Sequence, residues 1–209
     1  MATAKYDVHP GVKMVQDWVA GLKAKTGRTL DEWLDLVRTK GPKDEAARRE
    51  WLKAEHGLGT NGAWWIAERA RPAAERPVSE DDPASYLTAA AAYVERQYSG
   101  KRAALRPVYD GLVKLGRSLG KDVRVCPCQT IVPLYRRHVF AQIRPGTNTR
   151  VDLGLALGKH KGRLPARLID TGGKAKKDRI THRIELASKE DIDAELTKWL
   201  KIAYELDAD

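Results

Sequence analysis

The first third of the chain repeats its apolar residues at helical spacing. One stripe recurs every three or four positions and predicts a helix that Gly27 ends: Val12, Val15, Val19 and Leu22. Thr29 followed by Glu32 is a capping box, which marks the start of a second helix. That helix should end near Gly41 and Pro42, and its apolar face follows the i, i+3, i+4, i+7 pattern: Leu30, Trp33, Leu34 and Val37.

Two more helices are expected before residue 71. The third runs from about Asp44 to His56, with Gly57 as its terminator, and the fourth passes through residues 64–67. Five of the six tryptophans fall in this region, at positions 18, 33, 51, 64 and 65. We expect most of them in the core of a small bundle, where each ring buries about 150–250 Å². Adjacent Trp64 and Trp65 cannot face the same way, so one of them should be partly exposed.

The pattern changes beyond a linker expected at residues 72–85, which holds three prolines among acidic and small residues. Two helices are predicted over 86–97 and 105–119, and from residue 122 the apolar period falls to two. Alternation predicts five strands: 123–125, 131–135, 139–143, 151–157 and 179–186. Residues 144–148 should form a hairpin turn, 158–179 a long, mobile basic loop, and Ser188 should cap a final helix.

The order of these elements defines the fold class. Helices, then antiparallel strands, then a helix is an α+β arrangement: an N-terminal small helical bundle followed by an antiparallel sheet covered by helices on one face. A chain of 209 residues can hold two cores of about 100 residues each. We therefore expect a helical domain at 1–71, the linker at 72–85 and an α+β domain at 86–209.

The charge is distributed unevenly along the chain. Residues 1–100 hold 15 basic and 15 acidic side chains, residues 101–183 hold 20 and 5, and residues 184–209 hold 3 and 8. Nearly all of the net charge of +10 therefore comes from one stretch of the second half. Such a field attracts polyanions, whether nucleic acid, acidic protein or anionic lipid. A basic surface that serves only solubility is the alternative.

Several classes of protein are disfavoured. No apolar run approaches the ~20 residues that span a bilayer, and the first residues lack the apolar stretch of a secretory signal. Two cysteines cannot build a disulfide framework, which agrees with a reducing compartment. We expect a cytoplasmic protein without a membrane partner.

The two cysteines, Cys126 and Cys128, point the same way from a strand and supply half of a zinc site. Tetrahedral zinc needs four ligands and the sequence has no second cysteine pair, although His138, His160 and His182 could in principle complete the set. Packing of two small residues at the end of a strand is the preferred interpretation. No metal or other cofactor is predicted.

Two other features point toward chemistry without establishing it. Gly172-Gly173-Lys174 resembles the end of a phosphate-binding loop, but Ala175 replaces the required Ser or Thr, which excludes nucleotide hydrolysis by this route. Asp152 is the one carboxylate of the basic half to consider for catalysis, and a solvent-facing partner for a strand arginine is its simpler role. We expect that the protein is not an enzyme. A set of catalytic residues that only the fold brings together is the alternative.

Parts of the sequence resemble two bacterial families. Residues 25–33 (KTGRTLDEW) and 51–59 (WLKAEHGLG) resemble domain of unknown function 4287. Four later segments resemble domain of unknown function 5655: 109–112, 140–143, 151–155 and 199–204. The resemblance implies a bacterial chain of two joined domains, the second of which also occurs in proteins of nucleic-acid processing. It implies no established activity and no catalytic residues.

The leading hypothesis is a non-enzymatic binding module whose basic α+β half engages nucleic acid or another polyanion. The predicted contacts come from the strands and from the basic loop: Arg136, Arg137, Arg144, Arg150, Lys174, Lys176, Lys177 and Arg179. The alternative is a small-molecule or peptide-binding domain, or an enzyme, whose pocket between sheet and helices is lined by Tyr135, His138, Asp152 and His182. A third hypothesis gives the helical domain a protein partner bound by exposed tryptophans.

Overall fold

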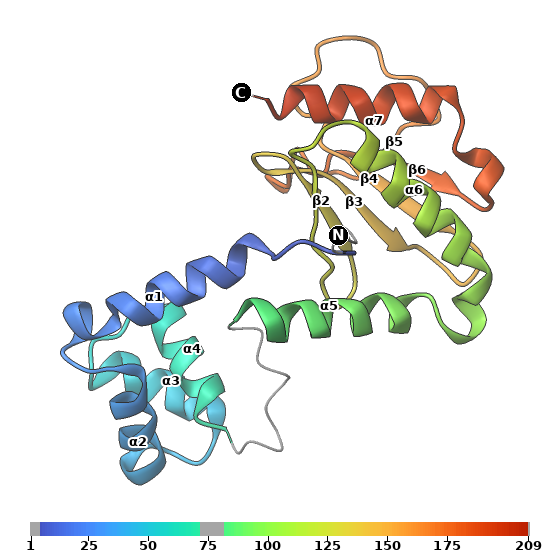
Figure 1. The fold of residues 1–209 in the computed structure, drawn as a ribbon. Coiled ribbons are helices and arrows are strands. Elements are labelled where there is room, and N and C mark those ends of the chain that lie inside the picture. Colours follow the sequence, from blue (N-terminus) through green and yellow to red (C-terminus); the bar gives the residue numbers. More distant parts are fainter. Residues whose placement is uncertain (1–4, 72–81, 209) are drawn as a thin grey trace. The chain divides into compact units, whose positions relative to one another are not determined.

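The structure is a computed structural model that describes residues 5–71 and 82–208. It contains two compact units, one of residues 10–86 and one of residues 1–9 with 87–209 (Figure 1). Most of the predicted linker, residues 72–81, lies outside the described residues. Its last positions already belong to helix α5 (Pro83–Gln97), because Asp82 accepts hydrogen bonds from the backbone nitrogens of Ala84 and Ser85 at 3.0 Å and so caps the helix.

Four helices form the first unit, and their bounds follow the predicted signals: α1 (Pro10–Thr26), α2 (Leu30–Lys40), α3 (Glu45–Ala54) and α4 (Thr60–Arg69). Both hydrogen bonds of the Thr29–Glu32 capping box are present. Trp33 lies in the core at 1% exposure, whereas Trp64 is 40% exposed. No helix of the described residues is both long and apolar enough to cross a membrane.

The second unit is built around a six-stranded antiparallel sheet with the order β1-β2-β3-β4-β6-β5 (Figure 1). Its strands are β1 (Arg124–Val125), β2 (Val132–Tyr135), β3 (Val139–Pro145), β4 (Val151–Leu155), β5 (Ile169–Asp170) and β6 (His182–Leu186). Its helices are α5, the 3-10 helix η2 (Gly100–Leu105), α6 (Arg106–Ser118), the 3-10 helix η3 (Lys189–Asp191) and α7 (Ala194–Leu206). The α+β class predicted from the pattern is confirmed.

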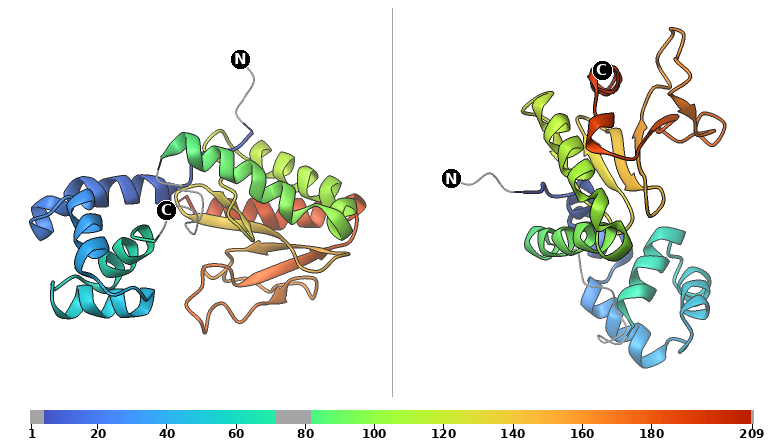
Figure 2. Two further views of the ribbon diagram at one scale, coloured as in Figure 1. Left: turned by 90° about the horizontal axis from the view of Figure 1, so that it is seen from below. Right: turned by 90° about the vertical axis from the view of Figure 1, so that its right-hand side faces the viewer.

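The two faces of the sheet differ in chemistry because alternate residues of a strand point to opposite sides. One face is apolar, with Leu134, Ala141 and Leu155 paired across three strands. Helices α6 and α7 pack on this face (Figure 2): a Cβ at Gly116 of α6 would lie 2.8 Å from Leu134. Tyr204 of α7 meets Phe140 edge to face beside the register shift between β2 and β3, where the strict alternation is interrupted. The opposite face carries polar residues in register.

Two details of the second unit differ from the sequence prediction. The expected loop 158–179 contains strand β5, which pairs with β6. Ser188 does not cap the final helix, because it caps η3 instead, and α7 starts after Asp193, whose side chain accepts a hydrogen bond from the Leu196 nitrogen at 2.8 Å. An Asp is as good an N-cap as a Ser, so the sequence offered two equivalent starts.

The segment before α1 belongs to the second unit. The Asp7 nitrogen donates to the Val125 carbonyl at 2.9 Å, and the Asp7 carboxylate accepts from the Val125 nitrogen and from Arg117, both at 2.8 Å. The residues preceding α1 therefore extend the β1 edge of the sheet. Only contacts distant in sequence place them there, which hydrophobic periodicity cannot reveal.

Candidate anion-binding cavity

The turn between β5 and β6 places a group of basic residues beside the end of α7. Its backbone is held by hydrogen bonds from Asp178 nitrogen to Gly173 oxygen at 2.8 Å and from Thr171 nitrogen to Thr181 oxygen at 3.0 Å. Gly173 is required because a Cβ there would lie 2.2 Å from the Ile180 carbonyl oxygen. The basic segment is thus a built turn with defined side-chain directions.

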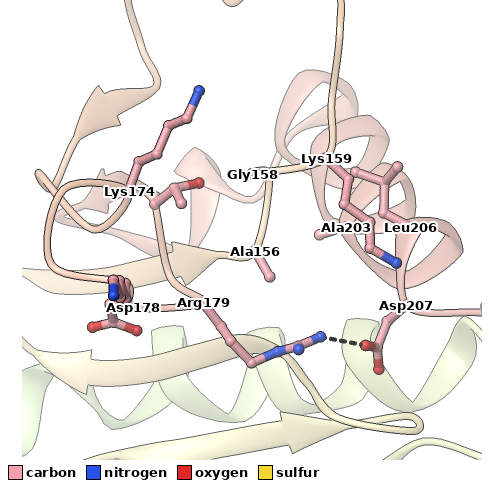
Figure 3. A pocket seen from close by; sticks show the side chains of 11 residues that line it. Ala156, Gly158, Lys159, Lys174, Asp178, Arg179, Ala203, Leu206 and Asp207 are labelled. Atoms are coloured by element: carbon pink, nitrogen blue, oxygen red, sulfur yellow. Dashed lines mark hydrogen bonds and ion pairs between the residues drawn. The ribbon is translucent and has the colours of Figure 1, made fainter.

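This turn lines a cavity of about 260 Å³ together with the β4–β5 connection and α7 (Figure 3). Its charged and polar lining residues are Lys159, Lys174, Lys177, Asp178, Arg179, Thr181 and Asp207. In Figure 3, Lys174 and Lys159 stand on opposite rims, and Arg179 reaches across the floor to Asp207. Four cationic side chains against two carboxylates leave the cavity electropositive.

Asp207 organises the floor of the cavity. Its side chain is 3% exposed and accepts hydrogen bonds from the His138 backbone nitrogen at 2.7 Å and from Arg179 at 2.8 Å. His138 Nδ1 lies 3.1 Å from Asp207 Oδ1, the same oxygen that accepts from Arg179. The carboxylate therefore fixes both Arg179 and the β2–β3 turn.

The lysines of the turn differ from Arg179 in their partners. Neither Lys174 nor Lys177 forms an ion pair with any residue in the described ranges. Lys177 has a φ of 56° and is the one non-glycine residue with positive φ in the described part of the chain. This conformation costs free energy in an L-residue, and such strain gathers at functional sites.

Two predicted contact residues on the strands are engaged inside the protein. Asp152 on the polar face of the sheet is 2% exposed and lies 2.9 Å from Arg150 and 3.4 Å from Arg144. Arg183 approaches the same carboxylate at 3.9 Å, and Arg150 also pairs with Glu185 at 3.0 Å. These arginines are therefore largely neutralised by their neighbours.

The remaining predicted contacts lie outside the cavity lining. Arg136 pairs with Asp122 at 2.8 Å and stacks on the Tyr204 ring, and its hydrogen bond to Asp122 raises the pKa of the guanidinium. Arg137 donates to the Ala208 carbonyl at 3.1 Å. Lys176 is exposed on the turn itself. The structure thus brings Lys174, Lys177 and Arg179 together and directs the others elsewhere.

The four residues of the alternative pocket have four different surroundings. Tyr135 bonds through its hydroxyl to His9 at 2.9 Å, and burial raises the pKa of this phenol to about 12. His138 binds Asp207, Asp152 binds the strand arginines, and His182 lies 3.0 Å from the Thr181 hydroxyl. The four side chains therefore have separate hydrogen-bond partners, and none of them lines the cavity at the β5–β6 turn.

Sequence reasoning missed Lys159 and Asp207 as cavity residues. Lys159 stands 15 residues before Lys174 in the same basic stretch, so its charge was visible but its direction was not. Asp207 belongs to the acidic C-terminal segment, and the sequence does not indicate that it pairs with Arg179, 28 positions earlier in the basic turn. No periodic pattern links either residue to the turn.

The cysteines and histidines do not assemble in the described ranges into a group that could hold a metal ion. Cys126 is buried, and desolvation raises the pKa of its thiol to about 12. This agrees with the packing interpretation of the pair.

Together, the fold and the cavity define a two-unit protein with a small helical unit and an α+β unit that carries a cavity lined by basic residues. Residues 94–207 match the family described as Domain of unknown function (DUF5655), and the chain belongs to this family. Residues 15–71 match the Domain of unknown function (DUF4287), which confirms both resemblances stated from the sequence. No curated protein and no solved structure matches the chain.

Proposed function

We propose that the α+β unit binds nucleic acid through its phosphate groups, with the cavity at the β5–β6 turn as the contact. The observation that carries this proposal is that one cavity is lined by four cationic residues: Lys159, Lys174, Lys177 and Arg179. The ammonium groups of Lys174 and Lys177 form no ion pair with a described residue and are available to phosphates, and each phosphate contact releases counterions. The surrounding basic stretch supplies long-range attraction.

The chemistry of the site favours contacts to the backbone of the nucleic acid over contacts to bases. Lysine is a compact point charge and does not read a base edge as a planar, two-pronged arginine does. Every Phe, Tyr and Trp ring in the described part of the α+β unit is buried or half-buried, which disfavours base stacking as the mode of binding. We infer binding that depends on charge and depends little on base sequence.

The test is fluorescence anisotropy with duplex DNA, single-stranded DNA and RNA across a salt series. For duplex DNA, log Kd should vary linearly with log salt, with a slope of about 0.9 per phosphate contacted. The double variant Lys174→Ala/Lys177→Gly should lower this slope by about 1 to 2 and weaken binding at low salt by about tenfold or more. Glycine is chosen at position 177 because the backbone there has positive φ.

The matched control is the double variant Lys101→Ala/Lys114→Ala, which removes the same charge from two exposed lysines outside this cavity. It should retain the slope within error. Equal losses of DNA affinity in both double variants would mean that only the net charge of the protein matters, and would contradict a site at the turn. Absence of binding by the wild-type protein at low salt would overturn the proposed function.

A further inference from the structure

A second cavity lies where the end of α5 and the 3-10 helix η2 meet the sheet. It has a volume of about 450 Å³ and is lined by Arg96, Gln97, Arg102, Gln129, Thr130, Ile131, Arg144 and Pro145. Cavities of about 300–1,000 Å³ are typical of sites for small molecules. The lining shares no residue with the cavity at the β5–β6 turn.

The charge of this cavity is entirely positive. Three guanidinium groups face it and no carboxylate lines it. Arg102 is held by the Asn148 side-chain oxygen at 3.2 Å, and Arg96 lies over the Tyr93 ring, so neither is neutralised by a described acidic residue. Arg144 shares Asp152 with two other arginines. Guanidinium groups bind phosphates and carboxylates through paired hydrogen bonds, so the cavity is suited to an anion.

The wall of the cavity contains a buried polar side chain with an unused acceptor. Gln97 is 4% exposed, and its amide nitrogen donates to the Cys128 carbonyl at 2.8 Å. The Cys128 nitrogen in turn donates to the Ile131 carbonyl at 2.8 Å, which closes the turn that forms the wall. The Gln97 side-chain oxygen has no hydrogen-bond partner among the described residues. A buried acceptor left without a donor is costly. The oxygen is closed to solvent in this structure, so a ligand donor reaches it when the Gln97 side chain turns toward the cavity, and a ligand that supplies this donor gains affinity there.

We propose that this cavity binds a small phosphate monoester that also carries an N–H or O–H donor. Arg96 and Arg102, which have no acidic partner among the described residues, take the phosphate, and Gln97 receives the donor. The proposal does not depend on nucleic-acid binding at the β5–β6 turn, because the two cavities share no residue. It concerns binding and assigns no reaction.

The probes are adenosine 5′-monophosphate, which has a phosphate and amine and hydroxyl donors, and inorganic phosphate, measured by isothermal titration calorimetry with the full chain. We expect the nucleotide to bind more tightly than phosphate. Arg96→Ala and Arg102→Ala should each weaken both probes by about tenfold, the loss typical of one charge-assisted contact. Gln97→Leu should weaken the nucleotide several-fold and leave phosphate unchanged.

The control is Lys101→Ala, which removes one positive charge next to Arg102 on η2 without altering the cavity lining. It should leave both affinities unchanged. Arg96 is exposed and Arg102 is half-buried, so their alanine variants should fold, and a thermal melt verifies this. Affinities that fall equally in Lys101→Ala, or heats absent for both probes, would overturn the site.

The same titration on Lys174→Ala/Lys177→Gly separates the two proposals. Unchanged nucleotide affinity in that variant places the ligand in the arginine cavity, whatever the result with DNA. Affinity lost there and retained in Arg96→Ala and Arg102→Ala would assign the nucleotide to the β5–β6 turn and contradict this inference.

Discussion

The arginines of the sheet and the lysines of the β5–β6 turn come from the same basic stretch of sequence, but among the described residues the arginines are paired with carboxylates and the lysines are not. Arg144 and Arg150 converge on the buried carboxylate of Asp152, so their charge stabilises the sheet. Lys174 and Lys177 line a cavity without carboxylate partners in the described ranges, so their charge is directed outward. Net charge along a sequence therefore does not identify a binding surface until the partners of each charge are known.

The packing of β4 explains why the sheet can neutralise its arginines. Every residue of this strand is buried. A Cβ on Gly146 would lie 2.4 Å from the Asp152 carboxylate, and a Cβ on Gly154 would lie 2.6 Å from Ile180, so chain segments cover the polar face at both positions. Water is kept away from Asp152, which strengthens its interactions with arginine.

The largest expected effect comes from breaking the paired cluster with Asp152→Ala. This change leaves Arg144, Arg150 and Arg183 close together with Glu185 as their remaining carboxylate. Removing one partner of a fully buried ion pair costs about 3–5 kcal/mol. The side chains of Arg144, Arg150 and Arg183 are 48%, 31% and 28% exposed and can be partly rehydrated, so we expect a loss near the lower end of that range, about 3 kcal/mol, in the free energy of unfolding of the α+β unit. Urea denaturation followed by circular dichroism measures it.

The matched control for Asp152 is Glu205→Gln, which removes a carboxylate whose side chain is 58% exposed and pairs with Lys201. An exposed pair of this kind contributes about 0–1 kcal/mol. A loss for Asp152→Ala no larger than that of the control would mean that the cluster does not stabilise the sheet.

An intermediate effect is expected for Asp207→Asn, which removes the buried carboxylate that pairs with Arg179 of the cavity. Asp207 is buried, but its partners Arg179 and His138 are about half exposed. They can be rehydrated when the carboxylate is lost, so we expect a destabilisation of about 1–3 kcal/mol, smaller than for Asp152. The same urea experiment checks the order of the two variants, and a larger loss for Asp207 would contradict the comparison.

The smallest effect, of opposite sign, is expected for Lys177→Gly. Glycine adopts positive φ without the cost of about 1–2 kcal/mol that an L-residue carries, and its greater freedom in the unfolded chain offsets part of the gain. We expect a net stabilisation of about 0.5 kcal/mol, measured as a rise in Tm. Lys174→Gly, at a residue without positive φ, should bring no such rise, and a gain in both variants would rule out backbone strain as the cause.

Local signals in the sequence predicted much of the fold. The Thr29–Glu32 capping box, the glycine after α1 and the change of apolar period near residue 122 all correspond to observed boundaries. These features depend on residues within a few positions of each other, which is why they can be read along the chain. The start of α7 escaped prediction because Ser188 and Asp193 are both good caps, and only the packing of the last helix selects between them.

The sequence by itself determined the helices, the alternating strands, the α+β class and the location of the excess positive charge. The tertiary structure decided which of those charges are available. Asp152 meets Arg183 across neighbouring strands, Asp207 meets Arg179 from the far end of the chain, and Gln97 comes to Cys128 over 31 positions. Such pairings follow from strand register and helix packing, and these depend on contacts between distant residues that no local pattern records.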